Sequence, residues 1–210
     1  MLTIDKARSW YSENDPVHGF DHILRVLKMA EHLAQMEGAD IEIVRAAALL
    51  HDAQDAAAEA SRAAHQIQSA IFARKVLRDQ GWTEERIQAV EHCIRAHRFR
   101  DDSEQPQTLE AKILFDADKL DAIGAIGAVR AIGYAVQAKQ NLNTKPSEQF
   151  LATGEKEPGE PHTPYHEFLY KLSKLKQRIY TSSARALAEK RHQFLETFFE
   201  QWQAELLNER

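Results

Sequence analysis

Apolar side chains recur every three or four residues along most of this chain, a spacing typical of amphipathic helices. Between Phe20 and Gly38 the residues that follow this spacing are Ile23, Leu24, Leu27, Ala30, Leu33 and Ala34. We find no convincing β-strand pattern and no internal repeat. The sequence therefore predicts an all-α fold, and a length of 210 residues suits a single domain spanning 1–210.

Cap and breaker residues divide the helical pattern into segments. Asp40 and Thr83 are suited to cap helix N-termini, and Thr163 precedes a proline at a first helical position. The expected helices cover residues 3–13, 20–37, 41–51, 61–79, 84–97, 108–138, 164–179 and 182–207.

Three glycines, Gly124, Gly127 and Gly133, fall inside the helix expected over 108–138. No β-branched strand precedes them, so the sequence GAIG does not indicate a dinucleotide-binding loop. We expect these small residues to let helices approach one another closely.

Residues 139–162 interrupt the helical pattern with a polar segment that contains proline, glycine and lysine. We expect a long excursion that is mobile or depends on a partner. One hypothesis is a lid whose lysines, Lys139, Lys145 and Lys156, meet substrate phosphates. The alternative is a solvated loop or an oligomer contact.

Composition narrows the classes of function. The formal charge is −5 and the pI is about 6.1. This composition does not show the excess of basic residues that is typical of a protein binding a nucleic-acid polymer. A single cysteine, Cys93, excludes an intrachain disulfide framework, and the first residues resemble no secretory signal, so we expect a cytoplasmic protein. The most apolar span, 120–138, carries Asp121 and Arg130, so we expect no membrane helix.

The helix expected over 41–51 ends in an unusual way. Its apolar run AAALL is followed at once by His51 and Asp52, and a second acid, Asp55, comes three residues later. Acids also lie between two apolar segments in ILFDADKLDAIG, at Asp116, Asp118 and Asp121. A buried carboxylate must be paired, hydrogen-bonded or bound to a metal. Lys119 and Arg130 are too few to neutralise this set, whereas a divalent cation would do so directly.

The ordered set His22, His51-Asp52 and Asp118, with the flanking sequences HDAQD and DADKLD, resembles the signature of the HD-domain metal-dependent phosphohydrolases. The similarity extends over most of the chain. HGFDHILRV resembles the first histidine motif of that family, and DADKLDAIGAIGAVRAIGY resembles a segment of a small bacterial subgroup of stand-alone HD hydrolases. The resemblance implies a single HD-type helical bundle over 1–210, with a C-terminal helical hairpin formed by the helices expected over 164–179 and 182–207.

The resemblance implies a metal site made of His22, His51, Asp52 and Asp118, with Asp116 as the rival of Asp118. Two imidazoles and two carboxylates suit one divalent first-row ion, or Mg²⁺, without distinguishing Mn, Mg, Co, Ni, Fe or Zn. Asp55 resembles the general base of related enzymes. In the alternative role, its carboxylate interacts with the end of a helix or with a lysine side chain.

Further candidates have less specific roles. We favour substrate-phosphate contacts over a second metal ion for His65 and His97. The other candidates for substrate binding are His18, His92 and Lys119.

The resulting hypothesis is a hydrolase of phosphate esters or anhydrides. The resemblance favours a nucleotide substrate, with a nucleoside triphosphate pyrophosphatase slightly favoured over a nucleotidase. The expected partner is a small phosphorylated molecule, with no nucleic-acid polymer and no membrane, and a homo-oligomer is compatible with the sequence. The alternative is a non-enzymatic helical module that retains a metal and binds a nucleotide or a protein.

Overall fold

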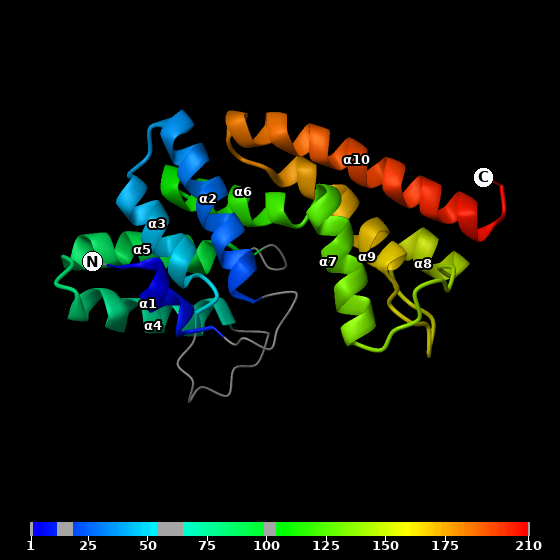
Figure 1. The fold of residues 1–210 in the computed structure, drawn as a ribbon, viewed down its shortest axis with the longest axis horizontal. Coiled ribbons are helices and arrows are strands. Elements are labelled where there is room, and N and C mark those ends of the chain that lie inside the picture. Colours follow the sequence, from blue (N-terminus) through cyan, green and yellow to red (C-terminus); the bar gives the residue numbers. More distant parts are fainter. Residues whose placement is uncertain (1, 12–18, 54–64, 99–103, 210) are drawn as a thin grey trace. The chain divides into compact units, whose positions relative to one another are not determined.

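The computed structural model describes residues 2–11, 19–53, 65–98 and 104–209. Over these ranges the chain forms ten α-helices, one 3₁₀ helix and no strand, which confirms the predicted all-α class (Figure 1). The elements are α1 Ile4–Arg8, α2 Phe20–Glu37, α3 Ile41–Leu50, α4 His65–Asp79, α5 Glu84–Ala96, α6 Leu109–Asp121, α7 Gly124–Gln137, α8 Glu148–Thr153, α9 Pro164–Tyr170, η1 Leu172–Arg178 and α10 Ser182–Leu206. None of the described helices is both long and apolar enough to cross a membrane.

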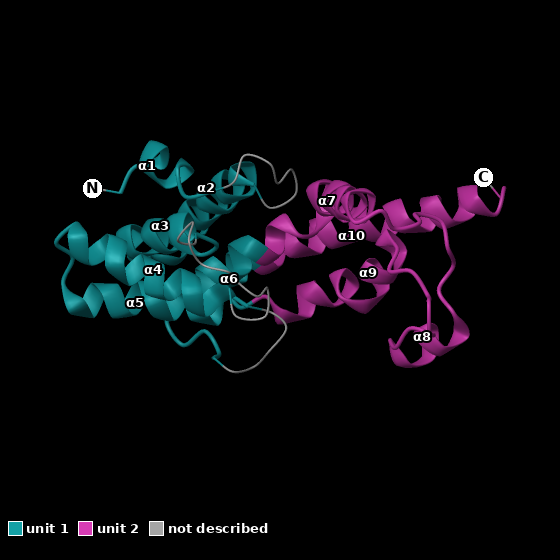
Figure 2. Cartoon of the chain, turned by 90° about the horizontal axis from the view of Figure 1, so that it is seen from below, with its two compact units in different colours: residues 1–118, 180–184 teal, residues 119–179, 185–210 magenta. Residues whose placement is uncertain are grey.

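The chain divides into two compact units (Figure 2). Unit 1 contains residues 1–118 and 180–184, and unit 2 contains residues 119–179 and 185–210. The single-domain interpretation stays a prediction.

Unit 1 is a bundle in which α4 packs along α5, α2 packs along α3, and α3 also contacts α5. Its core consists of aliphatic side chains and one aromatic ring that are almost completely excluded from solvent: Ile23, Leu33, Leu49, Leu50, Leu77, Ile87, Ile94, Ile113, Leu114 and Phe115. Burying side chains of this size contributes roughly 1.5–3 kcal/mol each. This core fixes the helix ends from which the polar site is built.

The predicted cap of α3 is confirmed. The Asp40 carboxylate accepts hydrogen bonds from the backbone N–H groups of Glu42 and Ile43, at 3.0 and 3.2 Å. The same carboxylate accepts two hydrogen bonds from the guanidinium of Arg86 on α5. One acid thus starts α3 and ties it to a neighbouring helix.

Two predicted helices differ from the observed elements, one near the N-terminus and one where α9 passes into η1. The helix expected over 3–13 is only Ile4–Arg8, because Trp10 and Tyr11 leave the helix to pack edge-on against Phe72 and at a tilt against Phe20. The helix expected over 164–179 is wrong as a continuous α-helix, since it passes into 3₁₀ geometry after Tyr170.

The single helix expected over 108–138 is also wrong. The chain breaks between α6 and α7, where Gly124 adopts φ +76°, a left-handed conformation that favours glycine. Gly127 does not serve the expected close approach of two helices. A Cβ at this position would lie 2.3 Å from the carbonyl oxygen of Ala122, so the glycine is needed for the break between α6 and α7. Gly124 does serve close helix approach, since a Cβ there would come 3.1 Å from Arg191 on α10.

The segment 139–162 is not the structureless excursion that its composition suggests. It contains α8, whose N-cap Ser147 accepts a hydrogen bond from the N–H of Phe150. The Glu160 carboxylate accepts hydrogen bonds from the backbone and hydroxyl of Ser147, from the N–H of Glu157 and from His166 Nε2, at 2.7–2.9 Å. One acid therefore joins the start of α8 and the residues after it to α9, and the lid hypothesis stays a prediction.

We expect Glu160→Gln to loosen residues 147–160, because an amide carries one acceptor oxygen in place of the carboxylate's two. Burial acts to raise the pKa of Glu160, but hydrogen bonds from His166 and Ser147 lower it to about 2. Its stabilising contribution is therefore complete above about pH 4.5 and is lost as the pH falls toward 2. Hydrogen exchange measured by mass spectrometry should rise in this segment. The exposed Glu155→Gln is the matched control, and equal protection in both variants would contradict the role of Glu160.

Candidate metal centre

Five polar side chains gather where four helices of unit 1 begin or end. His51 and Asp52 directly follow the last residue of α3, and His97 directly follows α5. His22 lies in the first turn of α2, and His65 is the first residue of α4. The apolar run before His51 packs α3 into the core, which places these polar groups at a defined point on the edge of the bundle.

One group of atoms surrounds Oδ2 of Asp52. His51 Nε2 lies 3.6 Å from this oxygen and His22 Nε2 lies 4.0 Å from it. Asp118, on α6, joins the group through an Oδ1 that lies 3.5 Å from His22 Nε2. The structure thus brings together the four residues that the sequence nominated as metal ligands.

A second group surrounds Oδ1, the other oxygen of Asp52. His65 Nε2 and His97 Nε2 lie 3.6 and 3.7 Å from it, and the two imidazole rings meet edge-on at 5.5 Å between centroids. The His97 ring also meets the His51 ring edge-on, at 5.1 Å. Asp52 therefore belongs to both groups, each of which could hold an ion.

Backbone carbonyls orient two of the imidazoles. Nδ1 of His51 donates to the carbonyl of Ala48 at 2.9 Å, and Nδ1 of His97 donates to the carbonyl of Ile94 at 2.5 Å. A neutral imidazole that donates from Nδ1 carries a lone pair on Nε2. Both rings therefore present an acceptor nitrogen toward Asp52, in the tautomer that metal-binding histidines commonly adopt.

The polar atoms at the centre fit a cation. Nε2 of His51 and Oδ1 of Asp52 are buried and have no hydrogen-bond partner among the residues that the structure describes. A buried polar group without a hydrogen bond lowers the stability of the fold by roughly 1–3 kcal/mol. A bound cation would remove this penalty for both atoms. An ion that binds nitrogen and oxygen at about 2.0–2.2 Å can bridge atoms spaced as these are. The residues thus form a His/Asp cluster suited to a divalent metal ion.

The electrostatic environment keeps Asp52 ionised. Burial acts to raise its pKa, but the positive charges of His51, His97 and His22, when these rings are protonated, lower it well below the ordinary range. An acid that stays charged in a partly buried position is a ready ligand for a cation.

A tyrosine that the sequence reading did not single out supports the same corner. The Tyr11 hydroxyl donates to the carbonyl of Leu49, in the last turn of α3, at 2.9 Å. Burial and then the charge of Asp52 raise the pKa of Tyr11 well above its usual value. The hydroxyl therefore stays protonated and holds the turn that carries His51. No sequence signal reveals this role, because it depends on a contact between residues 38 positions apart.

The two rival acids of the DAD motif have different surroundings. Asp116 is fully buried, and its carboxylate accepts the N–H of Tyr180 and both the N–H and the hydroxyl of Thr181, at 2.7–2.8 Å. These donors occupy both of its oxygens. Asp118, two residues later, faces His22 instead. The local geometry favours Asp118 as the ligand and gives Asp116 a structural role.

The other candidates are placed less centrally. His92 hydrogen-bonds to Glu104 Oε1 at 2.6 Å through Nδ1, and its Nε2 accepts from the N–H of Gln107. With both ring nitrogens engaged by the protein, His92 is suited to fixing the segment after α5 rather than to contacting phosphate. Lys119 is buried on α6. Asp55 and His18 lie outside the described residues.

Comparison with known proteins places the chain in a family. The HD domain model matches residues 19–123, a span that includes His22, His51, Asp52 and Asp118. This chain is a member of the HD domain family. The match confirms the resemblance that the ordered histidines and aspartates suggested.

Individual relatives agree with this assignment. The uncharacterized protein YpgQ of Bacillus subtilis is 31% identical over 209 residues, covering 96% of this chain and 93% of YpgQ. A crystal structure of YpgQ in complex with ADP matches with a TM-score of 0.73, 30% identity and 97% coverage of both chains. An HD-superfamily hydrolase from Bacillus thuringiensis matches with a TM-score of 0.69, 32% identity and coverage of 96% and 95%. The chain thus has the fold of the small stand-alone HD proteins.

The two acids of the DAD motif supply a matched pair of variants. We expect Asp118→Asn to abolish tight binding of Mn²⁺ while leaving the melting temperature of the metal-free protein nearly unchanged. Asp116→Asn should do the reverse, destabilising the fold by about 2–4 kcal/mol through its lost charge-assisted hydrogen bonds. Metal analysis and thermal unfolding measure the two effects. Retained Mn²⁺ in Asp118→Asn, or its loss in a folded Asp116→Asn, would exclude this division of roles.

Proposed function

We propose that this HD-family chain is a metal-dependent phosphohydrolase acting on a nucleotide, with hydrolysis of a nucleoside triphosphate to monophosphate and pyrophosphate as the favoured reaction. The observation that carries the proposal is the pair of groups around Asp52, which combines a cation site with two imidazoles directed at the same carboxylate. The ADP complex of YpgQ supports a nucleotide as the ligand class.

His22, His51, Asp52 and Asp118 would hold one divalent ion. This assignment places both carboxylates of the cluster around a single positive charge, which offsets their mutual repulsion. A divalent ion in that position supplies Lewis-acid activation of water and of a phosphoryl group.

His65 and His97 would contact a substrate phosphate. The second group offers only one carboxylate, which it shares with the first, so a second ion there would gain less charge compensation than the first. When protonated, these two imidazoles can instead donate an Nε2–H hydrogen bond to phosphate oxygens. We therefore expect one tightly bound ion per chain.

Asp55 is proposed as the general base. It follows Asp52 by three residues in the sequence HDAQD. A carboxylate in this position can accept a proton from the attacking water. The alternative role for Asp55, as a helix-end or lysine partner, involves no proton transfer from water.

The second candidate function is a non-enzymatic module that binds a nucleotide through a retained metal. Such a module needs the four ligands but has no requirement for a group that accepts a proton. Turnover of substrate separates the two functions, because only the enzyme releases product.

A substrate panel tests the proposed reaction. Nucleoside tri-, di- and monophosphates, bis-p-nitrophenyl phosphate and a short RNA are incubated with the chain and Mn²⁺, Mg²⁺ or Co²⁺. We expect pyrophosphate release from triphosphates, lost in His22→Ala and kept in His32→Ala, which removes an exposed histidine from the same helix. Nucleotide binding without product from any substrate would instead support the binding module.

The role of Asp55 has its own test. We expect Asp55→Asn to retain the metal ion and to lower kcat by about 10²–10⁴-fold, the usual loss for a general base. The control is Asp79→Asn, which makes the same change at the exposed end of α4. Wild-type kcat in Asp55→Asn would assign Asp55 to charge balance at the helix end.

A further inference from the structure

Two residues that the proposed function does not use are direct neighbours of the second group of imidazoles. Gln66 follows His65 at the start of α4, and Arg98 follows His97 after the end of α5. A hydrogen bond joins these neighbours, because Nη1 of Arg98 donates to Oε1 of Gln66 at 3.3 Å. The guanidinium of Arg98 is therefore held at the same corner of unit 1 as the rings of His65 and His97.

The amide of Gln66 fixes the position of this guanidinium. Gln66 is only 5% exposed, so its surroundings restrict its side chain, while Arg98 is half-buried and reaches solvent. A side chain that is already ordered loses less conformational entropy when it binds a ligand. A guanidinium carries five N–H donors in a planar fork, so it can contact Gln66 and a phosphate at the same time. Arg98 is thus preorganised for an anion.

A nucleotide requires positive charge that the proposed metal centre does not supply. One divalent ion held by the carboxylates of Asp52 and Asp118 leaves that centre without net positive charge. His97 donates from Nδ1 to a backbone carbonyl, so its Nε2 can donate to a phosphate only when the ring is protonated. An arginine, in contrast, stays charged at every physiological pH. Arg98 therefore provides a permanent positive charge beside these rings.

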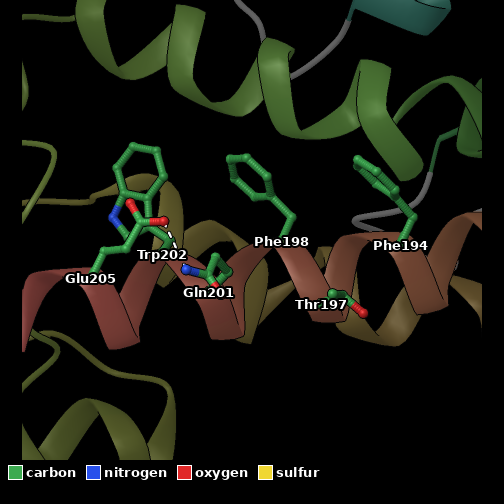
Figure 3. A pocket seen from close by; sticks show the side chains of 6 residues that line it. All are labelled: Phe194, Thr197, Phe198, Gln201, Trp202 and Glu205. Atoms are coloured by element: carbon green, nitrogen blue, oxygen red, sulfur yellow. Dashed lines mark hydrogen bonds between the residues drawn. The ribbon is translucent and has the colours of Figure 1, made fainter. Parts of the chain in front are cut away.

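A groove on α10 of unit 2 lacks this property. It has a volume of about 280 Å³, and Figure 3 shows the six residues that line it: Phe194, Thr197, Phe198, Gln201, Trp202 and Glu205. Glu205 is the only charged residue among these six, and its carboxylate accepts a hydrogen bond from Gln201 at 2.8 Å. A carboxylate repels phosphates, so this groove is not suited to the phosphates of a nucleotide.

We propose that Arg98 binds the phosphates of a nucleotide beyond the one that contacts the metal ion, and that Gln66 is its positioning residue. The inference rests on the proposed function, because it takes a nucleotide as the ligand. The planar guanidinium matches two phosphate oxygens at once. Arg98 therefore makes the site prefer nucleoside di- and triphosphates over monophosphates, whose single phosphate ends at the metal ion.

Calorimetric binding of ADP and of AMP to the full chain in Mn²⁺ tests the role of Arg98. We expect Arg98→Ala to weaken ADP binding at least about tenfold, because a charge-assisted contact to the second phosphate is lost. AMP binding should weaken less than about threefold, since AMP has no second phosphate. The matched control is Arg78→Ala, which removes an exposed arginine near the other end of α4 and should leave both affinities unchanged.

The ratio of the two affinities separates phosphate binding from support of the fold. Equal weakening of ADP and AMP, or unchanged ADP binding, would overturn the role of Arg98 and leave the proposed function intact. A wild type that neither binds nor hydrolyses any nucleotide would overturn both. Arg98→Lys provides the same comparison if the alanine variant does not fold. It keeps the charge but lacks the planar fork, so ADP binding should again fall more than AMP binding.

A double-mutant cycle tests the role of Gln66. Gln66→Met removes the acceptor oxygen but keeps an unbranched side chain of similar length, so the fold should persist. We expect this change to weaken ADP binding at least about threefold in the wild-type background and to have no further effect in Arg98→Ala. A structural role of Gln66 would not depend on Arg98. The same loss of affinity in both backgrounds, or no loss in either, would therefore overturn the positioning role.

Discussion

The carboxylate of Asp52 is the point on which the rest of the site depends. Its two oxygens face different imidazoles, with His51 and His22 near one and His65 and His97 near the other. A carboxylate in so little water must have positive charge or hydrogen-bond donors around it. The bundle meets this requirement by ending α3 and α5, and beginning α2 and α4, around a single acid.

The sequence was sufficient for the fold class and for the gathering of the four candidate ligands. Helical spacing of apolar residues predicts most of the helices, because burial in a helix imposes that spacing. The buried acids suggested a cation site, and the resemblance to the HD-domain signature assigned His22, His51, Asp52 and Asp118 to it. The roles of these residues as metal ligands remain predictions that the close approach of their side chains supports.

Other features could not be read from the chain, because they arise from contacts between distant residues. The break at Gly124 depends on one backbone angle and on the approach of Arg191, 67 positions later. The order in 139–162 depends on Glu160, whose four hydrogen-bond donors include His166 on α9. The polar composition of this segment did not reveal that a single acid connects its parts through hydrogen bonds.

The hydrogen bonds of Asp116 have a consequence for the order in which a nascent chain can mature. All four candidate ligands have been synthesised once Asp118 is made, yet the donors to Asp116 are Tyr180 and Thr181, 64 and 65 residues further on. At about 5–20 residues per second, the ribosome needs several seconds to supply them. During that interval α6 carries the candidate ligand Asp118 beside a carboxylate that lacks these donors. Asp116 therefore gains its hydrogen bonds only when the segment just before α10 has been made.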